Sequence, residues 1–97
     1  MELKKILAGL EGLKVKGSLD LDINNLDSDS RNINDGDMFV AIKGFDVDGH
    51  EYIKEAIGNG AKVILAQIDI DRKFIKEIPD DVTILLSENT RHALAIC

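Results

Sequence analysis

Three uninterrupted runs of apolar residues dominate the hydropathy pattern of this chain. They cover residues 38–42, 63–66 and 82–86, and polar positions do not alternate within them. A strand with one solvent-facing side alternates, whereas a strand covered on both sides reads as a continuous apolar run. The three runs therefore predict the central strands of a mixed β-sheet with both faces covered.

A helix is predicted between the first two runs, over residues 51–59. Asp48 and Glu51 have the spacing of a capping box, and Gly58-Asn59-Gly60 ends the helix because glycine and asparagine accept left-handed conformations. Its buried stripe is predicted to comprise Tyr52, Ile53, Ala56 and Ile57. A strand, a helix and a second strand in this order indicate parallel pairing through a right-handed crossover.

Weaker patterns flank this unit. One face of a short amino-terminal helix is predicted to carry Leu3, Ile6, Leu7 and Leu10. Residues 14–17 indicate a short edge strand, and the alternation over residues 19–24 indicates a half-exposed strand. Residues 71–78 predict a short helix that Pro79 ends.

The pattern is still helical where the sequence stops. Ser87 or Asn89 is placed to cap a last helix, whose remaining apolar positions are Ala93, Leu94 and Ile96. We therefore expect residues 1–97 to be one small α/β domain, a mixed sheet flanked by helices, within a longer natural protein.

Composition narrows the class of partner. The chain has 18 acidic and 12 basic residues, a net charge of −6, which argues against nucleic acid because phosphates need a basic surface. Its one cysteine, Cys97, excludes a disulfide framework, and no segment reads as a signal peptide or membrane span. A cytoplasmic protein is the simplest interpretation.

Several common site types find no support in the sequence. Asp27-x-Asp29 resembles part of a calcium loop, but the sixth position is Asn32 where glycine is needed. No phosphate-binding Gly-x-x-x-x-Gly-Lys-Ser/Thr loop occurs, and Ser30 has no glycine elbow. The residues by themselves indicate no metal site and no catalytic machinery.

Two polar segments beside the first apolar run remain as a candidate ligand site. Asp29-Ser30-Arg31 precedes the run and Lys43-Gly44-Phe45-Asp46-Val47 follows it. Both segments can lie on one rim of a small sheet and share a ligand. Ser30 can donate and accept hydrogen bonds, as the edge of a pyrimidine base requires.

Of the other residues in these segments, Arg31 and Phe45 each have two interpretations, and Gly44 has a backbone role. Arg31 can bind a phosphate or form a structural ion pair with a nearby carboxylate. The acidic candidates for that pair are Asp35, Asp37 and Asp48. Phe45 can stack on a base or shield the segment, and Gly44 lets backbone amides approach a ligand closely.

Four motifs in order resemble the amino-terminal domain of the Mur ligases, the ATP-dependent amide ligases that build the peptidoglycan stem peptide. The motifs are Asp29-Ser30-Arg31, residues 36–44, Asp48-Gly49-His50 and Ala56-Ile57-x-x-Gly60-Ala61, and residues 89–95 match more loosely. Residues 43–50 are most similar to the branch that adds the third stem residue. The branch that adds the terminal dipeptide usually has glutamate where this chain has Phe45.

The resemblance implies a division of labour. Residues 1–97 would hold the uridine-diphosphate end of UDP-N-acetylmuramoyl-L-Ala-D-Glu, while ATP and magnesium bind a central domain and the amino acid a carboxyl-terminal domain of the same protein. The fragment alone is then expected to be inactive, with no nucleic acid or membrane partner. The alternatives are the dipeptide-adding ligase and a non-catalytic docking module of the same fold.

The family's pattern also implies which residues touch the nucleotide. Carried over, the contacts are Ser28, Ser30, Phe45, Asp46 and Val47. The supporting residues are Asp29, Arg31, Lys43, Gly44, Asp48 and His50. Asp46 is expected to act through backbone or sugar contacts, because its carboxylate repels a diphosphate.

Overall fold

In a computed structural model of the chain, a mixed sheet forms the centre of the molecule. The structure describes residues 2–7, 13–42, 49–67, 72–76 and 78–87. Within these residues the strand order is β1-β5-β4-β3-β2. The strands are β1 (Lys14–Lys16), β2 (Leu26–Asp27), β3 (Met38–Val40), β4 (Val63–Gln67) and β5 (Thr83–Ser87). Neighbours pair in parallel except β1, which runs antiparallel to β5. The predicted mixed sheet and the edge strand near residue 14 are confirmed.

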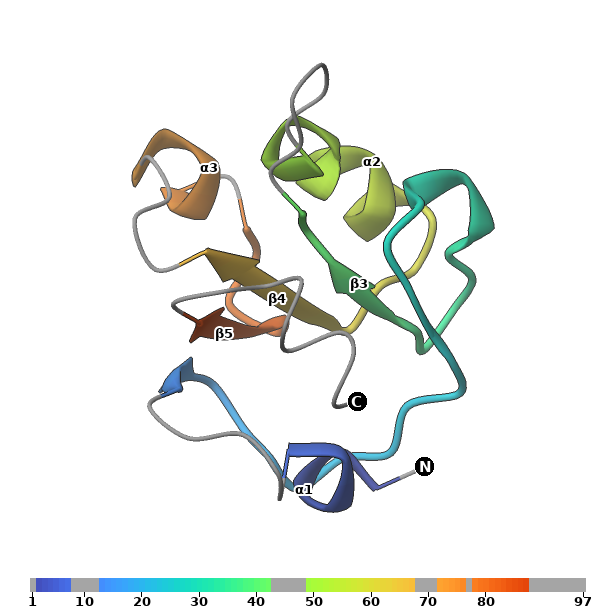
Figure 1. The fold of residues 1–97 in the computed structure, drawn as a ribbon, viewed down its shortest axis with the longest axis vertical. Coiled ribbons are helices and arrows are strands. Elements are labelled where there is room, and N and C mark those ends of the chain that lie inside the picture. The colour runs from blue at the N-terminus through green and yellow to red at the C-terminus, as the bar shows by residue number, and fades with distance from the viewer. Residues whose placement is uncertain (1, 8–12, 43–48, 68–71, 77, 88–97) are drawn as a thin grey trace.

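Helices lie on both faces of the sheet. The helical elements are α1 (Leu3–Ile6), η2 (Ser30–Asn32), η3 (Gly49–Tyr52), α2 (Ile53–Gly58) and α3 (Arg72–Lys76), where η marks a 3-10 turn. Figure 1 shows α2 and α3 above the sheet and α1 below it. The sheet is therefore the middle layer of three, which explains why its central strands carry no polar alternation.

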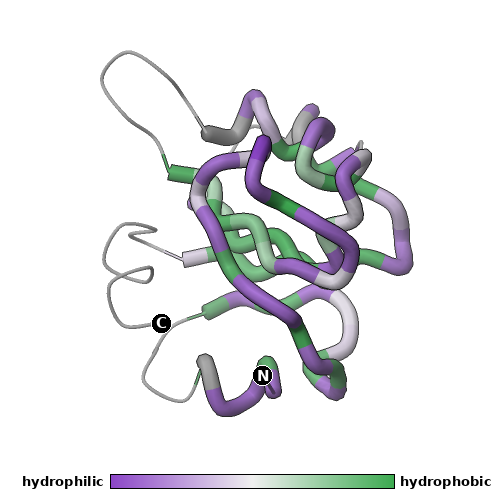
Figure 2. Tube along the Cα trace, turned by 90° about the vertical axis from the view of Figure 1, so that its right-hand side faces the viewer, coloured by the Kyte–Doolittle hydropathy of each residue, from purple (hydrophilic) through white to green (hydrophobic). Residues whose placement is uncertain are grey.

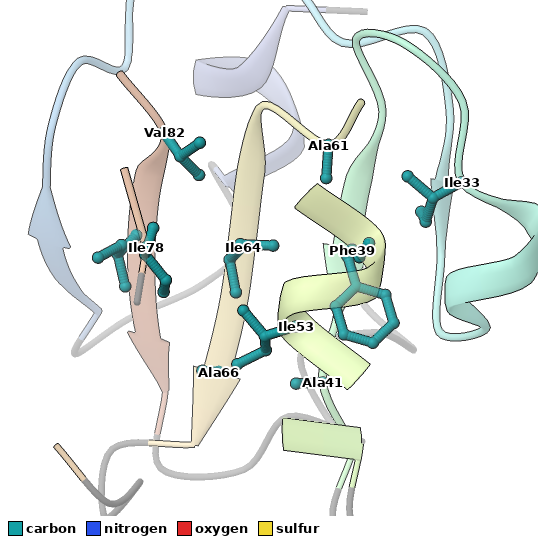
Figure 3. Close-up of a cluster of buried hydrophobic side chains, with 11 residues drawn as sticks. Ile33, Phe39, Ala41, Ile53, Ala61, Ile64, Ala66, Ile78 and Val82 are labelled. Atoms are coloured by element: carbon teal, nitrogen blue, oxygen red, sulfur yellow. The ribbon is translucent and has the colours of Figure 1, made fainter. Parts of the chain in front are cut away.

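Alternate residues of the strands pack into two separate cores. Phe39 and Ile64 point to the side covered by α2, where they meet Ile53 (Figure 3). Met38 and Val40 point to the opposite side and pack with a cluster that includes Leu3 and Leu7 of the amino-terminal turn. Phe39 is 1% exposed and Val40 0%, so both are core residues as predicted. In Figure 2 the apolar segments accordingly gather inside the fold and the polar ones outside.

Two glycines fix the approach of β3 and β4 at their amino ends. Gly36 has φ +82° in the predicted turn, and its N–H donates to the carbonyl of Gly60 at 2.9 Å. Gly60 has φ +111°, and a β-carbon there would lie 2.6 Å from Cα of Asp35. Gly60 therefore does more than end α2: only glycine fits both the backbone angle and the contact.

Several predicted details are wrong. Residues 19–24 form no strand; apart from an isolated bridge between Glu2 and Asp22, they run as an irregular segment. Its apolar side chains still pack against the α1 side of the core. The alternating pattern therefore indicated which side chains are buried, although the segment pairs with no neighbouring strand. Ser87 is the last residue of β5, and Asn89, the other predicted cap, lies outside the described residues, so the predicted cap stays a prediction. The helix expected after it lies outside the described residues.

The α-helix between β3 and β4 is shorter than predicted. A 3-10 turn occupies Gly49–Tyr52, and α2 then begins after Tyr52, whose side chain makes no capping hydrogen bond. Tyr52 is 39% exposed instead of buried, because the tighter turn rotates it off the apolar stripe. Ile53 and Ala56 are buried as predicted. Asp48 of the expected capping box lies outside the described residues.

Candidate functional site

The first candidate segment lies at the carboxyl edge of the parallel strands, where β3 also ends. β2 and β3 are parallel neighbours, with Leu26 opposite Met38 and Asp27 opposite Phe39. Residues that follow the two strands therefore leave the sheet at the same edge, which is where open parallel sheets bind ligands. η2 follows β2 at this edge, and residues 41–42 follow β3.

Part of the predicted site cannot be placed. Lys43, Gly44, Phe45, Asp46, Val47 and Asp48 lie outside the described residues. For His50 the structure describes the backbone, in η3, but not the side chain. The contacts predicted for these residues stay predictions.

The segment after β2 is shaped by its own carboxylates. Oδ1 of Asp27 accepts a hydrogen bond from the N–H of Asp29 at 2.8 Å. Oδ1 of Asp29 then accepts from the N–H of Arg31 at 3.0 Å, which caps η2. Short aspartate side chains that bond the backbone two residues on favour such tight turns. The sequence of this segment therefore sets its conformation locally.

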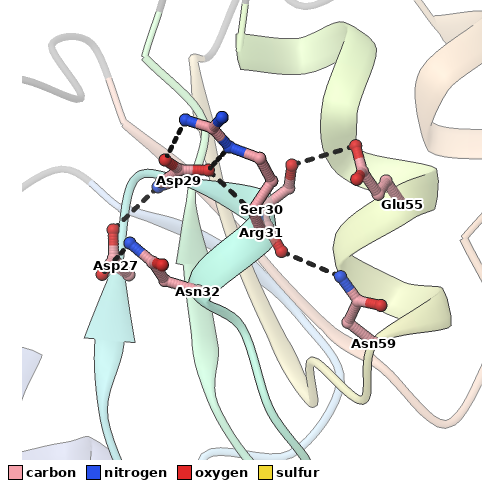
Figure 4. Close-up of polar contacts among 7 residues, drawn as sticks. All are labelled: Asp27, Asp29, Ser30, Arg31, Asn32, Glu55 and Asn59. Carbon is pink, nitrogen blue, oxygen red and sulfur yellow. Dashed lines mark hydrogen bonds and ion pairs between the residues drawn. The ribbon is translucent and has the colours of Figure 1, made fainter.

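Arg31 pairs with Asp29, which was not among the three carboxylates that the sequence suggested; of those three, Asp48 lies outside the described residues. Its Nε lies 3.1 Å from Oδ1 and its Nη2 2.8 Å from Oδ2, a two-point contact (Figure 4). Hydrogen bonds from the Arg31 side chain, and then from its backbone N–H, hold the pKa of Asp29 below its ordinary value. The same contact raises the pKa of Arg31. Asp37 instead accepts backbone N–H groups of Asn25 and Asn34.

Ser30 is the most enclosed residue of the segment, at 4% exposed. Its hydroxyl donates to Oε2 of Glu55 at 3.1 Å, and its carbonyl accepts from Nδ2 of Asn59 at 2.9 Å. Figure 4 shows both partners on the face of α2 that looks toward η2. Ser28, by contrast, is exposed.

Sequence reasoning missed Glu55 and Asn59. Both are typical of solvent-facing helix positions, and both side chains are exposed in the structure. Their spacing of four residues, which puts two polar side chains on one helix face, was the available signal. The edge therefore presents Ser28 and the paired Arg31 outward, with Ser30 fixed behind them.

A depression of about 300 Å³ lies on the α1 side of the molecule. It is lined by Glu2, Lys4, Leu19, Asp20, Leu21 and Asp22. Lys4 pairs with Asp20 at 2.5 Å, so the lining keeps a net negative charge. Such a surface repels a nucleotide diphosphate, and the carboxyl edge remains the better candidate.

The residues that the structure describes include neither a metal-binding cluster nor a membrane-spanning helix. No group of three or more histidine, cysteine, aspartate or glutamate side chains stands close enough to hold a metal ion. Among the same residues, no helix has the length and apolarity needed to cross a bilayer.

Comparison with known proteins identifies the family. The sequence profile described as "Mur ligase family, catalytic domain" matches residues 22–96. The chain therefore belongs to the Mur ligase family, and the resemblance drawn from the four motifs is confirmed.

Curated relatives match almost the whole chain. It is 42% identical over 96 residues to the UDP-N-acetylmuramoyl-L-alanyl-D-glutamate--2,6-diaminopimelate ligase of Clostridium perfringens, with 99% of this chain and 19% of that protein covered. The ligase of the same name from Clostridioides difficile is 47% identical over 79 residues, 78% of this chain and 16% of that protein. The chain thus spans about a fifth of the length of these relatives.

Solved structures confirm the fold class. The first crystal structure of MurF from Acinetobacter baumannii superposes with a TM-score of 0.76 at 25% identity, over 97% of this chain and 19% of that one. MurF of Thermotoga maritima, solved in complex with ADP, gives a TM-score of 0.57 at 35% identity, over 74% and 15%.

Proposed function

We propose that this chain is the domain that holds the uridine-diphosphate end of UDP-N-acetylmuramoyl-L-Ala-D-Glu in a ligase that adds the third residue of the peptidoglycan stem peptide. The observation that carries the proposal is 42% identity, along 99% of the chain, to a ligase whose name contains that substrate. ATP and magnesium would bind in a further domain of the parent protein, because residues 1–97 contain no phosphate-binding glycine loop.

The nucleotide would lie at the carboxyl edge of β2 and β3. Ser28 and Ser30 come from the segment after β2, and Phe45, Asp46 and Val47 from the segment after β3. Support comes from the parallel register of the two strands, which starts both segments at the same sheet edge. Arg31, held by Asp29, is the exposed cation of the first segment.

One alternative function has an observation in its favour. Several solved structures that match the fold are MurF proteins, and another is a D-alanyl-D-alanyl ligase of Acinetobacter baumannii. The sequence favours the third-residue ligase, because identity is 42% to the ligase of Clostridium perfringens, against 25% and 35% to the MurF structures of Acinetobacter baumannii and Thermotoga maritima. The roughly thirty residues that follow position 97 in the parent protein are a direct check: a Gly-rich loop ending in Lys-Ser or Lys-Thr supports a ligase, and its absence supports a docking module.

Calorimetry with uridine diphosphate tests the binding role. Ser30→Ala removes one hydrogen-bonding group, worth about 0.5–1.5 kcal/mol net, so affinity should fall about threefold to tenfold. Ser18→Ala is the matched control, since Ser18 follows β1, at the other end of the strand order from β2, and its hydroxyl accepts from the N–H of Asp20, outside the proposed site. Equal affinity of the wild type and Ser30→Ala would contradict the assignment of Ser30.

A further inference from the structure

Helix α2 contacts the Ser30 segment through two side chains with opposite hydrogen-bonding roles. Glu55 accepts a hydrogen bond from the Ser30 hydroxyl at 3.1 Å, and Asn59 donates one to the Ser30 carbonyl at 2.9 Å (Figure 4). Glu55 and Asn59 are one helical turn apart, so they approach the same residue from one face of α2. Side chain and backbone of Ser30 are thereby fixed together.

The position of α2 in the chain connects this two-point contact with the second candidate segment. η3 (Gly49–Tyr52) leads directly into α2, and residues 43–48 directly precede η3 in the chain. The helix is therefore joined covalently to the second candidate segment and by hydrogen bonds to the first. Ile53 and Ala56 are buried in the core and fix the position of the helix.

We infer that Glu55 and Asn59 are positioning residues for the nucleotide, which hold the segment of Ser28–Ser30 in the conformation that binds it. This inference rests on the proposed function of the edge. A segment ordered before the ligand arrives loses less conformational freedom on binding, so the contact raises affinity without touching the ligand.

The two hydrogen-bonding roles predict opposite outcomes for the two conservative variants. Glu55→Gln keeps an oxygen that accepts from the Ser30 hydroxyl, whereas Glu55→Ala does not; both remove one negative charge. Asn59→Asp keeps the shape but has no N–H to give to the Ser30 carbonyl. A role in packing alone would make both conservative variants tolerable, so the pattern identifies the hydrogen bonds.

The experiment is a calorimetric titration of each 97-residue variant with uridine diphosphate, in salt high enough to screen surface charge. We expect Glu55→Ala to bind about three- to tenfold more weakly than Glu55→Gln, the size of one net hydrogen bond. Asn59→Ala and Asn59→Asp should both weaken binding by a similar factor. Lys54→Gln, an exposed change on α2 that also shifts the net charge by −1, is the control for Asn59→Asp.

Each result either supports or overturns the inference. Equal affinities of Glu55→Ala and Glu55→Gln, or Asn59→Asp binding like the wild type, would overturn it while the proposed function stands. Loss of affinity beyond that of Lys54→Gln supports the donor role of Asn59. If the folded wild type binds no uridine diphosphate at millimolar concentration, the proposed function fails first. Circular dichroism of every variant ensures that only folded protein is compared.

Discussion

Two glycines at the end of α2 predict stability changes of opposite sign. Gly60 has φ +111°, an angle that L-residues rarely adopt, and an added β-carbon would lie 2.6 Å from Cα and 2.8 Å from N of Asp35. Gly58, two residues earlier, has no positive φ and nothing within 4 Å of such a carbon. The change to alanine is therefore the same chemistry in two different environments.

The magnitudes follow from these two environments. For Gly60→Ala, backbone strain costs about 1–3 kcal/mol, and the contact with the Asp35 backbone adds about 1–3 kcal/mol as overpacking. The sum is a large part of the roughly 5–15 kcal/mol that stabilises a small domain. Gly58→Ala should instead stabilise by up to about 1 kcal/mol, because alanine is the better helix former.

Urea denaturation followed by circular dichroism measures both changes. We expect a lower midpoint for Gly60→Ala, or an unfolded protein at zero urea, and an equal or higher midpoint for Gly58→Ala. A Gly60→Ala midpoint at or above that of the wild type would refute the close approach of residues 35 and 60. It would also refute the geometry that aligns β3 with β4.

Three other predictions concern the core, one ion pair and activity. Val40→Ala should lower the free energy of unfolding by about 1–3 kcal/mol through two lost methyl groups and the cavity they leave, and unchanged denaturant melts would show that β3 is not buried. Asp29 should titrate below its ordinary range in carbon-detected nuclear magnetic resonance, because Arg31 bonds its ionised form. Since the pKa of Asp29 is lower in the folded state, its contribution to stability is present above the unfolded pKa and is lost as pH falls through the folded pKa. Arg31→Gln should raise the titration midpoint of Asp29. An unmoved midpoint would exclude the pair in solution. The purified chain should not hydrolyse ATP with UDP-N-acetylmuramoyl-L-Ala-D-Glu, and substrate-dependent phosphate release would contradict this.

The central sheet was predictable because its strands are buried on both faces. Continuous apolar runs such as 63–66 leave few other interpretations once a helix and a glycine stop precede them. β2 was missed because Leu26–Asp27 is two residues long and owes its conformation to pairing with β3. Local pattern carries no information about a neighbour that is eleven residues away along the chain.

The candidate site was predictable only in part. Motif resemblance identified Ser30 and Arg31, but the partners of Ser30 depend on the packing of η2 against α2, which the spacing of residues alone does not determine. Arg31 pairs with Asp29 because the tight turn places the two side chains side by side. Glu55 and Asn59 gained their roles from the same packing, since on an isolated helix both side chains would face water.

A titration of isotope-labelled chain with uridine diphosphate, followed by nuclear magnetic resonance, tests the central claim most directly. We expect saturable shifts in the backbone signals of residues 28–31 and 44–48, the segments that follow β2 and β3 in the chain. Residues 58–60, at the amino end of β4, should shift little. Shifts confined to residues 58–60 or to the depression around Asp20, with residues 28–31 and 44–48 unmoved, would contradict it.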